Sequence, residues 1–278
     1  MTRSSSLGDT GRDFLNHTAA EGGWTSFRRG RRIPTISVVS AGESERSAPE
    51  RREALKDLLE QARSCERCGE LAATRKTVVF GAGNADAELM FVGEAPGASE
   101  DEQGLPFVGR AGKLLEKLLE EIGMTRTEVF IANVLKCRPP GNRDPLPIEI
   151  QNCSDYLLAQ VELIQPAVIC TLGNFSTKLL RGDPTGITRL HGQAEELLLG
   201  SRMVRLYPIY HPAAALYTPA MLQTLREDFS RLPELLALGA PAQPQGPALG
   251  EPIPEEASEP PADEVAQRHG EVNQLGLF

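Results

Sequence analysis

The chain has 278 residues, and only 5% of them are aromatic, which is low for a chain that folds along its whole length. We therefore expect part of it to lie outside a folded core. No apolar run approaches the roughly 18 residues of a membrane span, and the first residues lack the basic-then-apolar order of a secretory signal. These features exclude a membrane protein and predict a soluble, cytoplasmic one.

The formal net charge is -9, which taken alone argues against a nucleic-acid partner. The charge is unevenly distributed. Residues 241–278 contain seven acidic residues and one basic residue, so this segment alone carries -6. The remainder carries only -3, and that charge is compatible with a local basic face for nucleic acid.

Residues 1–50 show no sustained apolar period and contain the basic cluster RRGRR at 28–32. We expect a disordered extension here, with the cluster as a solvated charge run rather than a DNA-contacting arm. The next segment, RREALKDLLEQARS at 51–64, places its leucines on one helical face. It predicts a helix that ends where the first cysteines begin.

Four short apolar runs then follow, each typical of a buried strand: ELMFV (88–92), EVFIANV (128–134), AVICTL (167–172) and VRLYPIY (204–210). Segments of helical period separate them, among them 112–123 and 148–164. This alternation predicts an α/β fold of three layers, a four-stranded parallel sheet flanked by helices. Ligands of such folds bind beyond the carboxyl ends of the strands. The residues just past those ends are Glu94, Asn133, Gly173 and His211.

Five cysteines at irregular spacing argue for thiols or metal ligands rather than a disulfide scaffold. Cys170 lies inside an apolar run and is predicted to be a buried core residue. The other four allow a closed four-thiolate site: Cys65, Cys68, Cys137 and Cys153. Spacing alone leaves zinc and an iron–sulfur cluster equally open. A redox dithiol is disfavoured, because the Cys-x-x-Cys pair ends a helix and does not follow the strand of a βαβ unit.

Three motifs follow the predicted strands: GEAPGASEDEQGLPFVGRAGKLL (93–115), NVLKCRPPGNRDP (133–145) and HPAAAL (211–216). The first combines a tight Gly/Pro loop, an acidic patch, Phe107 and a glycine-led helix, an arrangement that suits close approach of a small ligand or a phosphate backbone. One such loop alone could be a turn, but three at one sheet edge favour a binding site. The histidine of HPAAAL is then a better functional candidate than a lone strand-end histidine.

At these residues the chain closely resembles the family 4 uracil-DNA glycosylases, the iron–sulfur members of the uracil-DNA glycosylase superfamily, from about residue 60 to residue 235. The resemblance implies that the four cysteines hold a 4Fe-4S cluster and that residues 51–238 form a glycosylase domain with a four-stranded parallel sheet. It also implies a DNA repair enzyme that flips uracil out of DNA and hydrolyses its N-glycosidic bond, leaving an abasic site.

The resemblance extends to single residues of the motifs. Glu94 corresponds to the water-positioning end of the site, and Glu100 to the acid beside C5 of the base. Phe107 is similar to the ring that stacks on the flipped base, Asn133 to the amide that reads uracil, and His211 to the histidine that faces the leaving group. These assignments are what the family likeness implies for the site.

The chemistry of the reaction fits these residue types. Negative charge develops on the departing pyrimidine, and a fixed histidine donor at O2 stabilises it. An asparagine amide can donate to O4 of uracil and accept from N3–H, whereas cytosine mismatches both bonds, at about 1–3 kcal/mol for each unpaired group. Glu100 is the candidate that excludes the methyl group of thymine. Tyr217, which follows HPAAAL, departs from the family pattern and leaves the duplex-wedging residue unassigned.

Two other interpretations remain open. The first is a non-catalytic four-cysteine metal module that binds nucleic acid or protein, which needs no convergence of Asn, Phe and His at strand ends. The second keeps the fold but acts on another deaminated or mismatched base, such as hypoxanthine or thymine. Assay of uracil release from an oligonucleotide separates the first from the glycosylase.

The sequence ends on QLGLF at 274–278, inside a segment, 239–278, that we expect to be a disordered acidic Pro-rich tail. QLGLF resembles the bacterial sliding-clamp binding peptide; the alternative is a random apolar end. In the first case Gln274 supplies an anchoring hydrogen bond, and an apolar groove receives Leu275, Leu277 and Phe278. The tail then tethers a monomeric enzyme to replicating DNA at the nucleoid.

Overall fold

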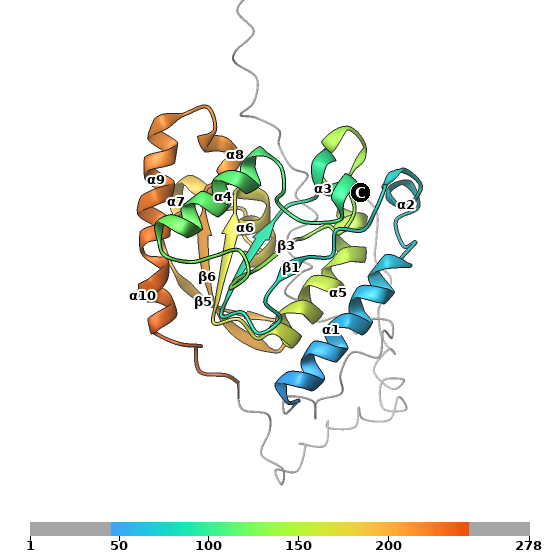
Figure 1. Cartoon of the computed structure of the whole chain (residues 1–278), viewed down its shortest axis with the longest axis horizontal. Coiled ribbons are helices and arrows are strands. Elements are labelled where there is room, and N and C mark those ends of the chain that lie inside the picture. Colours follow the sequence, from blue (N-terminus) through green and yellow to red (C-terminus); the bar gives the residue numbers. More distant parts are fainter. Residues whose placement is uncertain (1–45, 245–278) are drawn as a thin grey trace, which may run out of the picture. The chain divides into compact units, whose positions relative to one another are not determined.

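The computed structural model describes residues 46–244, which Figure 1 draws as ribbons. The predictions made for residues 1–45, including RRGRR, and for residues 245–278, including QLGLF, fall outside the described residues. Across the described part of the chain, no helix has the length and apolar character needed to cross a membrane.

A six-stranded mixed sheet lies at the centre, in the order β1-β3-β2-β4-β6-β5. Its parallel part is formed by the four predicted strands: β2 (Leu89–Gly93), β3 (Phe130–Asn133), β4 (Val168–Leu172) and β6 (Arg202–Ile209). Every residue of β2, β3 and β4 is buried, as expected for parallel strands that are covered on both faces. The three-layer α/β prediction is confirmed.

The sheet has two strands more than the four that were predicted. β1 (Ala82–Gly83) pairs antiparallel with β3, and β5 (Glu195–Leu199) pairs antiparallel with β6, so they form the two edges. β1 has two residues, too few for any alternation to show in the sequence. β5 reads EELLL, and a short run of this kind is ambiguous between helix and strand because its polar and apolar residues do not alternate.

Helices cover both faces of the sheet (Figure 1). One face carries α1 (Ala48–Arg63), α5 (Pro147–Ile164) and α6 (Asn174–Arg181). The other face carries α4 (Arg110–Glu121), α9 (Pro219–Ser230) and α10 (Leu232–Ala237). Successive strand residues point to opposite faces of the sheet. Met90 packs in the apolar cluster under α1, α5 and α6, and Phe91 packs in the cluster under α4, α9 and α10. The core is therefore divided into two buried clusters, one under each helical layer.

Short helices occupy the connections: α2 (Gly69–Thr74), α3 (Ala98–Gln103), the 3₁₀ turn η1 (Pro140–Asn142), α7 (Ile187–Leu190) and α8 (Pro212–Ala215). The longer α1 begins at a capping box, in which the Ser47 N–H donates to the Glu50 carboxylate at 2.8 Å. It ends shortly before Cys65, as predicted. Because α1 packs against α5, which carries Cys153, the two helices bring distant cysteine segments together.

Candidate functional site

Five predicted side chains lie at or beyond the carboxyl edge of the parallel strands. We call them the strand-end site: Glu94, Glu100, Phe107, Asn133 and His211. Asn133 is the last residue of β3, Glu94 follows β2, and His211 follows β6 by two residues. Because these strands are parallel, their ends meet at one edge of the sheet, where ligands of α/β folds bind.

The backbone at Gly93 lies between the Asn133 amide and the Phe107 ring. A Cβ added at Gly93 would come within 2.4 Å of Asn133 Oδ1 and 2.7 Å of Phe107 Cζ. Any other residue would therefore displace the amide or the ring. The ring centroids of Phe107 and His211 are 5.6 Å apart, and the two ring planes are tilted by 30°. Amide, phenyl ring and imidazole thus form one continuous group.

The amide oxygen of Asn133 is buried without a hydrogen-bond partner among the described residues. Leaving an acceptor in this state costs about 1–3 kcal/mol. The side chain is 2% exposed, so little water reaches it. Such an atom at a sheet edge is satisfied when a ligand supplies an N–H group.

Phe107 is held in an uncommon backbone conformation, with a φ of 52°. Arg126 fixes this turn: its Nη1 donates to the Phe107 carbonyl at 2.9 Å, and its Nη2 donates to the Pro106 carbonyl. Gly112 leaves the room that this carbonyl needs, because a Cβ there would lie 1.7 Å from the Phe107 oxygen. Sequence reasoning missed Arg126, which acts on the turn from 19 residues away and belongs to no motif.

Glu100 is bound to the backbone of the same turn. Its Oε1 accepts hydrogen bonds from the N–H groups of Val108 at 3.0 Å and Gly109 at 2.9 Å. Gly109 immediately precedes α4, so the carboxylate lies at the positive end of that helix. Its Oε2 would be 2.8 Å from a Cβ at Gly97. The carboxylate is therefore held by two backbone N–H groups, in space that any side chain at position 97 would occupy.

His211 is oriented by the short helix that follows it. Its Nδ1 accepts the backbone N–H of Ala213 at 3.1 Å, which leaves the proton on Nε2. Desolvation lowers the pKa of His211 to about 4, although the charge of Glu100 opposes this shift. Gly173, at a φ of 92°, packs behind it, where an added Cβ would lie 3.0 Å from the His211 Cβ. The ring is thus a neutral, fixed hydrogen-bond donor at pH 7.

Glu94 is a half-buried carboxyl group close to the ends of β2 and β3. Its backbone carbonyl accepts the N–H of Leu135 at 3.0 Å, which continues the pairing of the two strands past their ends. Burial, with a smaller contribution from the charge of Asp144, raises the pKa of Glu94 to about 7. A carboxyl group whose pKa is raised by burial at the carboxyl ends of parallel strands is typical of a functional position.

The four predicted cysteine ligands come from three segments that the fold brings together at one apolar cluster: Cys65 with Cys68, Cys137, and Cys153. Burial raises the pKa of the Cys137 thiol, and the charges of Cys65 and Cys68 raise it further, so these thiols are neighbours. Cys170 is fully buried in β4 and belongs to the other cluster, which confirms it as a core residue.

N–H groups surround the sulfur atoms of this four-cysteine site. Arg75 Nη1 lies 3.3 Å from the Cys137 Sγ, and Asn152 Nδ2 lies 3.5 Å from the Cys68 Sγ. Arg75 also donates from Nη2 to the Cys65 carbonyl at 2.7 Å, so it joins two of the cysteine segments. Donors directed at thiolate sulfur are the environment in which soft metal centres are stabilised.

Four cysteine thiols are a donor set that both a zinc ion and an iron–sulfur cluster accept. Within residues 46–244, no three His, Cys, Asp or Glu side chains are arranged to hold a metal ion. The residue types of the four-cysteine site suit a thiolate-bound metal centre.

A buried lysine connects the four-cysteine site to the strand-end site. Lys136 is 1% exposed, and its Nζ donates to the Asn133 carbonyl at 2.8 Å and to Gln160 Oε1 at 2.6 Å. Its backbone N–H lies 3.5 Å from the Cys153 Sγ. Sequence reasoning did not single out Lys136, because a lysine is expected at the surface.

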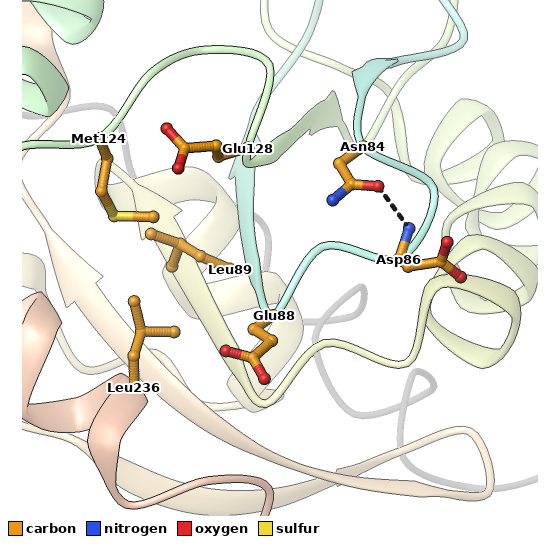
Figure 2. A pocket seen from close by; sticks show the side chains of 7 residues that line it. All are labelled: Asn84, Asp86, Glu88, Leu89, Met124, Glu128 and Leu236. Carbon is orange, nitrogen blue, oxygen red and sulfur yellow. Dashed lines mark hydrogen bonds between the residues drawn. The ribbon is translucent and has the colours of Figure 1, made fainter. Parts of the chain in front are cut away.

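The cavity in Figure 2 lies at the opposite end of the parallel strands, beside Leu89, where β2 begins. It has a volume of about 280 Å³ and is lined by Asn84, Asp86, Glu88, Leu89, Met124, Glu128 and Leu236. Its acidic lining is unsuited to phosphate or DNA. This cavity is separate from the strand-end site.

The model of the uracil DNA glycosylase superfamily matches residues 80–232. The chain belongs to this superfamily. The type-4 uracil-DNA glycosylase of Archaeoglobus fulgidus is 46% identical to it over 187 residues, which cover 66% of this chain and 94% of that protein. The type-4 uracil-DNA glycosylase of Sulfurisphaera tokodaii is 46% identical over 188 residues, 66% of this chain and 85% of that protein.

The likeness to a second type of uracil-DNA glycosylase is weaker. The type-5 uracil-DNA glycosylase of Pyrobaculum aerophilum is 28% identical over 217 residues, which cover 66% of this chain and 91% of that protein. The predicted resemblance to the type-4 group of the superfamily is therefore confirmed. The superfamily match contains all five residues of the strand-end site.

We predict that Glu94→Gln makes the protein more stable at alkaline pH and changes little in acid. The pKa of Glu94 is higher in the folded state, about 7, than its ordinary 4.5, so folding is disfavoured as pH rises from 4.5 through 7. Urea unfolding at about pH 8 should show a gain of about 2 kcal/mol for the variant, and at about pH 5 a much smaller one.

The matched control is Glu120→Gln on the exposed side of α4, a substitution that removes no buried carboxyl group. Parallel stability curves for Glu94→Gln and the unmodified protein across this pH range would contradict the assignment of Glu94 as a desolvated acid.

Proposed function

We propose that this protein is a uracil-DNA glycosylase of base excision repair, which binds uracil flipped out of DNA and hydrolyses its N-glycosidic bond to leave an abasic site. The observation that carries the proposal is the buried, unpartnered amide oxygen of Asn133, beside the Phe107 ring and the neutral His211. Membership of the superfamily and the type-4 relatives support the same reaction.

The Asn133 amide provides the recognition of uracil. Its Oδ1 accepts from N3–H and its Nδ2 donates to O4, which satisfies the atom that is unpaired without ligand. Cytosine has no N3–H and carries an amino donor in place of O4, so both bonds fail. Phe107, fixed by Arg126, supplies the face on which the base stacks.

His211 provides the stabilisation of the departing base. Its Nε2–H donates to uracil O2, where negative charge develops as the glycosidic bond breaks. The hydrogen bond from Ala213 and the close packing of Gly173 fix the ring before substrate arrives, so no reorganisation is needed during the reaction. A neutral donor also avoids desolvating a cation in this site.

The two carboxylates complete the proposed site. We assign Glu94 to the positioning of the attacking water, since its pKa of about 7 gives an ionised fraction at neutral pH. Glu100, fixed by two backbone N–H groups, is assigned to the edge of the base at C5, where it leaves no room for the methyl group of thymine. A non-catalytic metal module would need none of this convergence.

We predict that His211→Ala and Asn133→Ala each slow uracil release by at least about a hundredfold, the scale for removing one pre-organised electrostatic contact. Single-turnover cleavage of a uracil-containing oligonucleotide measures this, with binding of the abasic product as the control that should change less. A near-normal rate for either variant would remove that residue from the mechanism. The same measurement on an oligonucleotide that carries hypoxanthine in place of uracil tests the alternative base.

We propose that the four-cysteine site holds a 4Fe-4S cluster, bound by Cys65, Cys68, Cys137 and Cys153. When bound, the cluster supplies a structural cross-link. The thiolate donor set and the N–H groups of Arg75 and Asn152 around it support this assignment. Its role is to join the segment after α1 to the segment that follows Asn133, and so to brace the strand-end site.

We predict that protein purified without oxygen absorbs at about 400 nm, as thiolate-bound iron–sulfur clusters do. Cys137→Ser and Cys153→Ser should lose this absorption, whereas Cys170→Ser, the matched control in β4, should retain it. Metal analysis of the same samples distinguishes zinc from an iron–sulfur cluster. Stoichiometric zinc without iron would refute the cluster.

The roles that we expect for the segments outside residues 46–244 remain predictions. We propose the division into an extension at 1–50, a glycosylase domain at 51–238 and an acidic tail at 239–278, and a monomeric enzyme of the cytoplasm at the nucleoid. We also propose that QLGLF binds a DNA polymerase sliding clamp. The composition of the tail supports a tether, because its seven acidic residues keep it away from DNA.

We predict that deletion of residues 274–278 abolishes binding to a sliding clamp and leaves uracil release from a free oligonucleotide unchanged, because all five residues of the strand-end site lie between positions 94 and 211. Affinity for immobilised clamp and the cleavage rate are measured on the same preparations. A control deletion of equal length within the tail, residues 246–250, should preserve clamp binding. Equal affinity with and without QLGLF would end the idea.

A further inference from the structure

Tyr217 is the most exposed large apolar or aromatic side chain among the described residues, with 75% of its surface accessible. It is nevertheless fixed in place. Arg110 Nη1 donates to the Tyr217 hydroxyl at 2.8 Å, and the guanidinium carbon lies 5.1 Å from the ring centroid. The two residues are 107 positions apart in the chain, so the fold has to bring them together.

This Tyr217–Arg110 pair adjoins the strand-end site from two directions. Arg110 is the first residue of α4, directly after Gly109, whose N–H binds Glu100. Tyr217 follows α8, the short helix that begins after His211. α4 and α8 pack against each other and lie near one another in Figure 1. The pair therefore stands at the rim of the site.

The pair has the chemistry of a stacking platform for nucleic acid. Aromatic rings bind bases irrespective of sequence, because every base has a π-face, and arginine adds a cation that attracts the phosphates. Arg110 restrains the Tyr217 ring before DNA arrives, which reduces the entropy lost on binding. Arg110 is itself exposed, so its other N–H groups face water or a bound strand.

We propose that Tyr217, braced by Arg110, stacks on a nucleobase next to the flipped uracil in the same DNA strand. This contact presupposes the proposed function and extends it to the neighbouring nucleotides. Stacking needs only one base face, so it does not require a second strand. The contact is independent of the base sequence around the uracil.

The test uses a single-stranded oligonucleotide that carries one non-hydrolysable 2′-fluoro-deoxyuridine with the fluorescent base 2-aminopurine beside it. Tyr217→Ala should weaken binding about tenfold, within the range for loss of one aromatic–base stack. It should also abolish the fluorescence quenching that the unmodified protein causes. Tyr217→Phe, which keeps the ring, should retain most of the affinity, and Arg110→Ala should fall between the two.

The controls separate the platform from the uracil site and from folding. Leu238→Ala, at an exposed position after α10, is the matched truncation and should bind normally. Inhibition by free uracil should be equal in Tyr217→Ala and the unmodified protein, because the base site is intact. Equal thermal melting of the two proteins shows that the fold is kept.

Two results would overturn the stacking contact. One is unchanged affinity of Tyr217→Ala for the single strand. The other is a loss of affinity only for duplex DNA. The ring would then fill the gap that the flipped base leaves in the duplex, and would not stack on a base of the substrate strand. Failure of the proposed function has a different signature: no release of uracil by the unmodified protein, whatever Tyr217 does to DNA binding.

Discussion

The site depends on the register in which two neighbouring parallel strands pair. β2 and β3 align so that Gly93 stands opposite Asn133. A shift by one residue would turn the asparagine to the other face of the sheet and place a side chain where the glycine allows close approach. The register is itself fixed by apolar burial on both faces, since every residue of these two strands is buried. Packing of the core therefore determines the position of the amide.

The strand-end site contains groups that the rest of the fold avoids. An amide oxygen lacks a partner, a carboxyl group has a pKa of about 7, and Phe107 has a positive φ. Each of these features destabilises the free protein, and all three belong to the strand-end site. The two apolar clusters supply the stability that tolerates them. Such local conflict is the usual signature of a site shaped for a ligand.

The sequence was sufficient to predict the parallel strands and the side chains that follow them, because buried apolar runs and strand-end loops leave clear local patterns. It could not reveal cations whose side chains bind the backbone carbonyls of the site. Arg126 holds two carbonyls, and Lys136 holds the Asn133 carbonyl, yet both look like surface cations in the sequence. The edge strand β5 was missed because only one of its five residues is fully buried and no long-range partner is visible in the sequence.

Lys136 has a consequence for how the protein can evolve or be redesigned. This one residue links the neighbourhood of Cys153, through its backbone N–H, to the last carbonyl of β3, through its Nζ. Loss of Cys153 would remove the sulfur atom beside the Lys136 backbone N–H. Conversely, a substitution that moves the Asn133 backbone also moves the carbonyl to which Lys136 is anchored. Under the proposed function, base choice and retention of the proposed cluster are therefore traits that selection must change together.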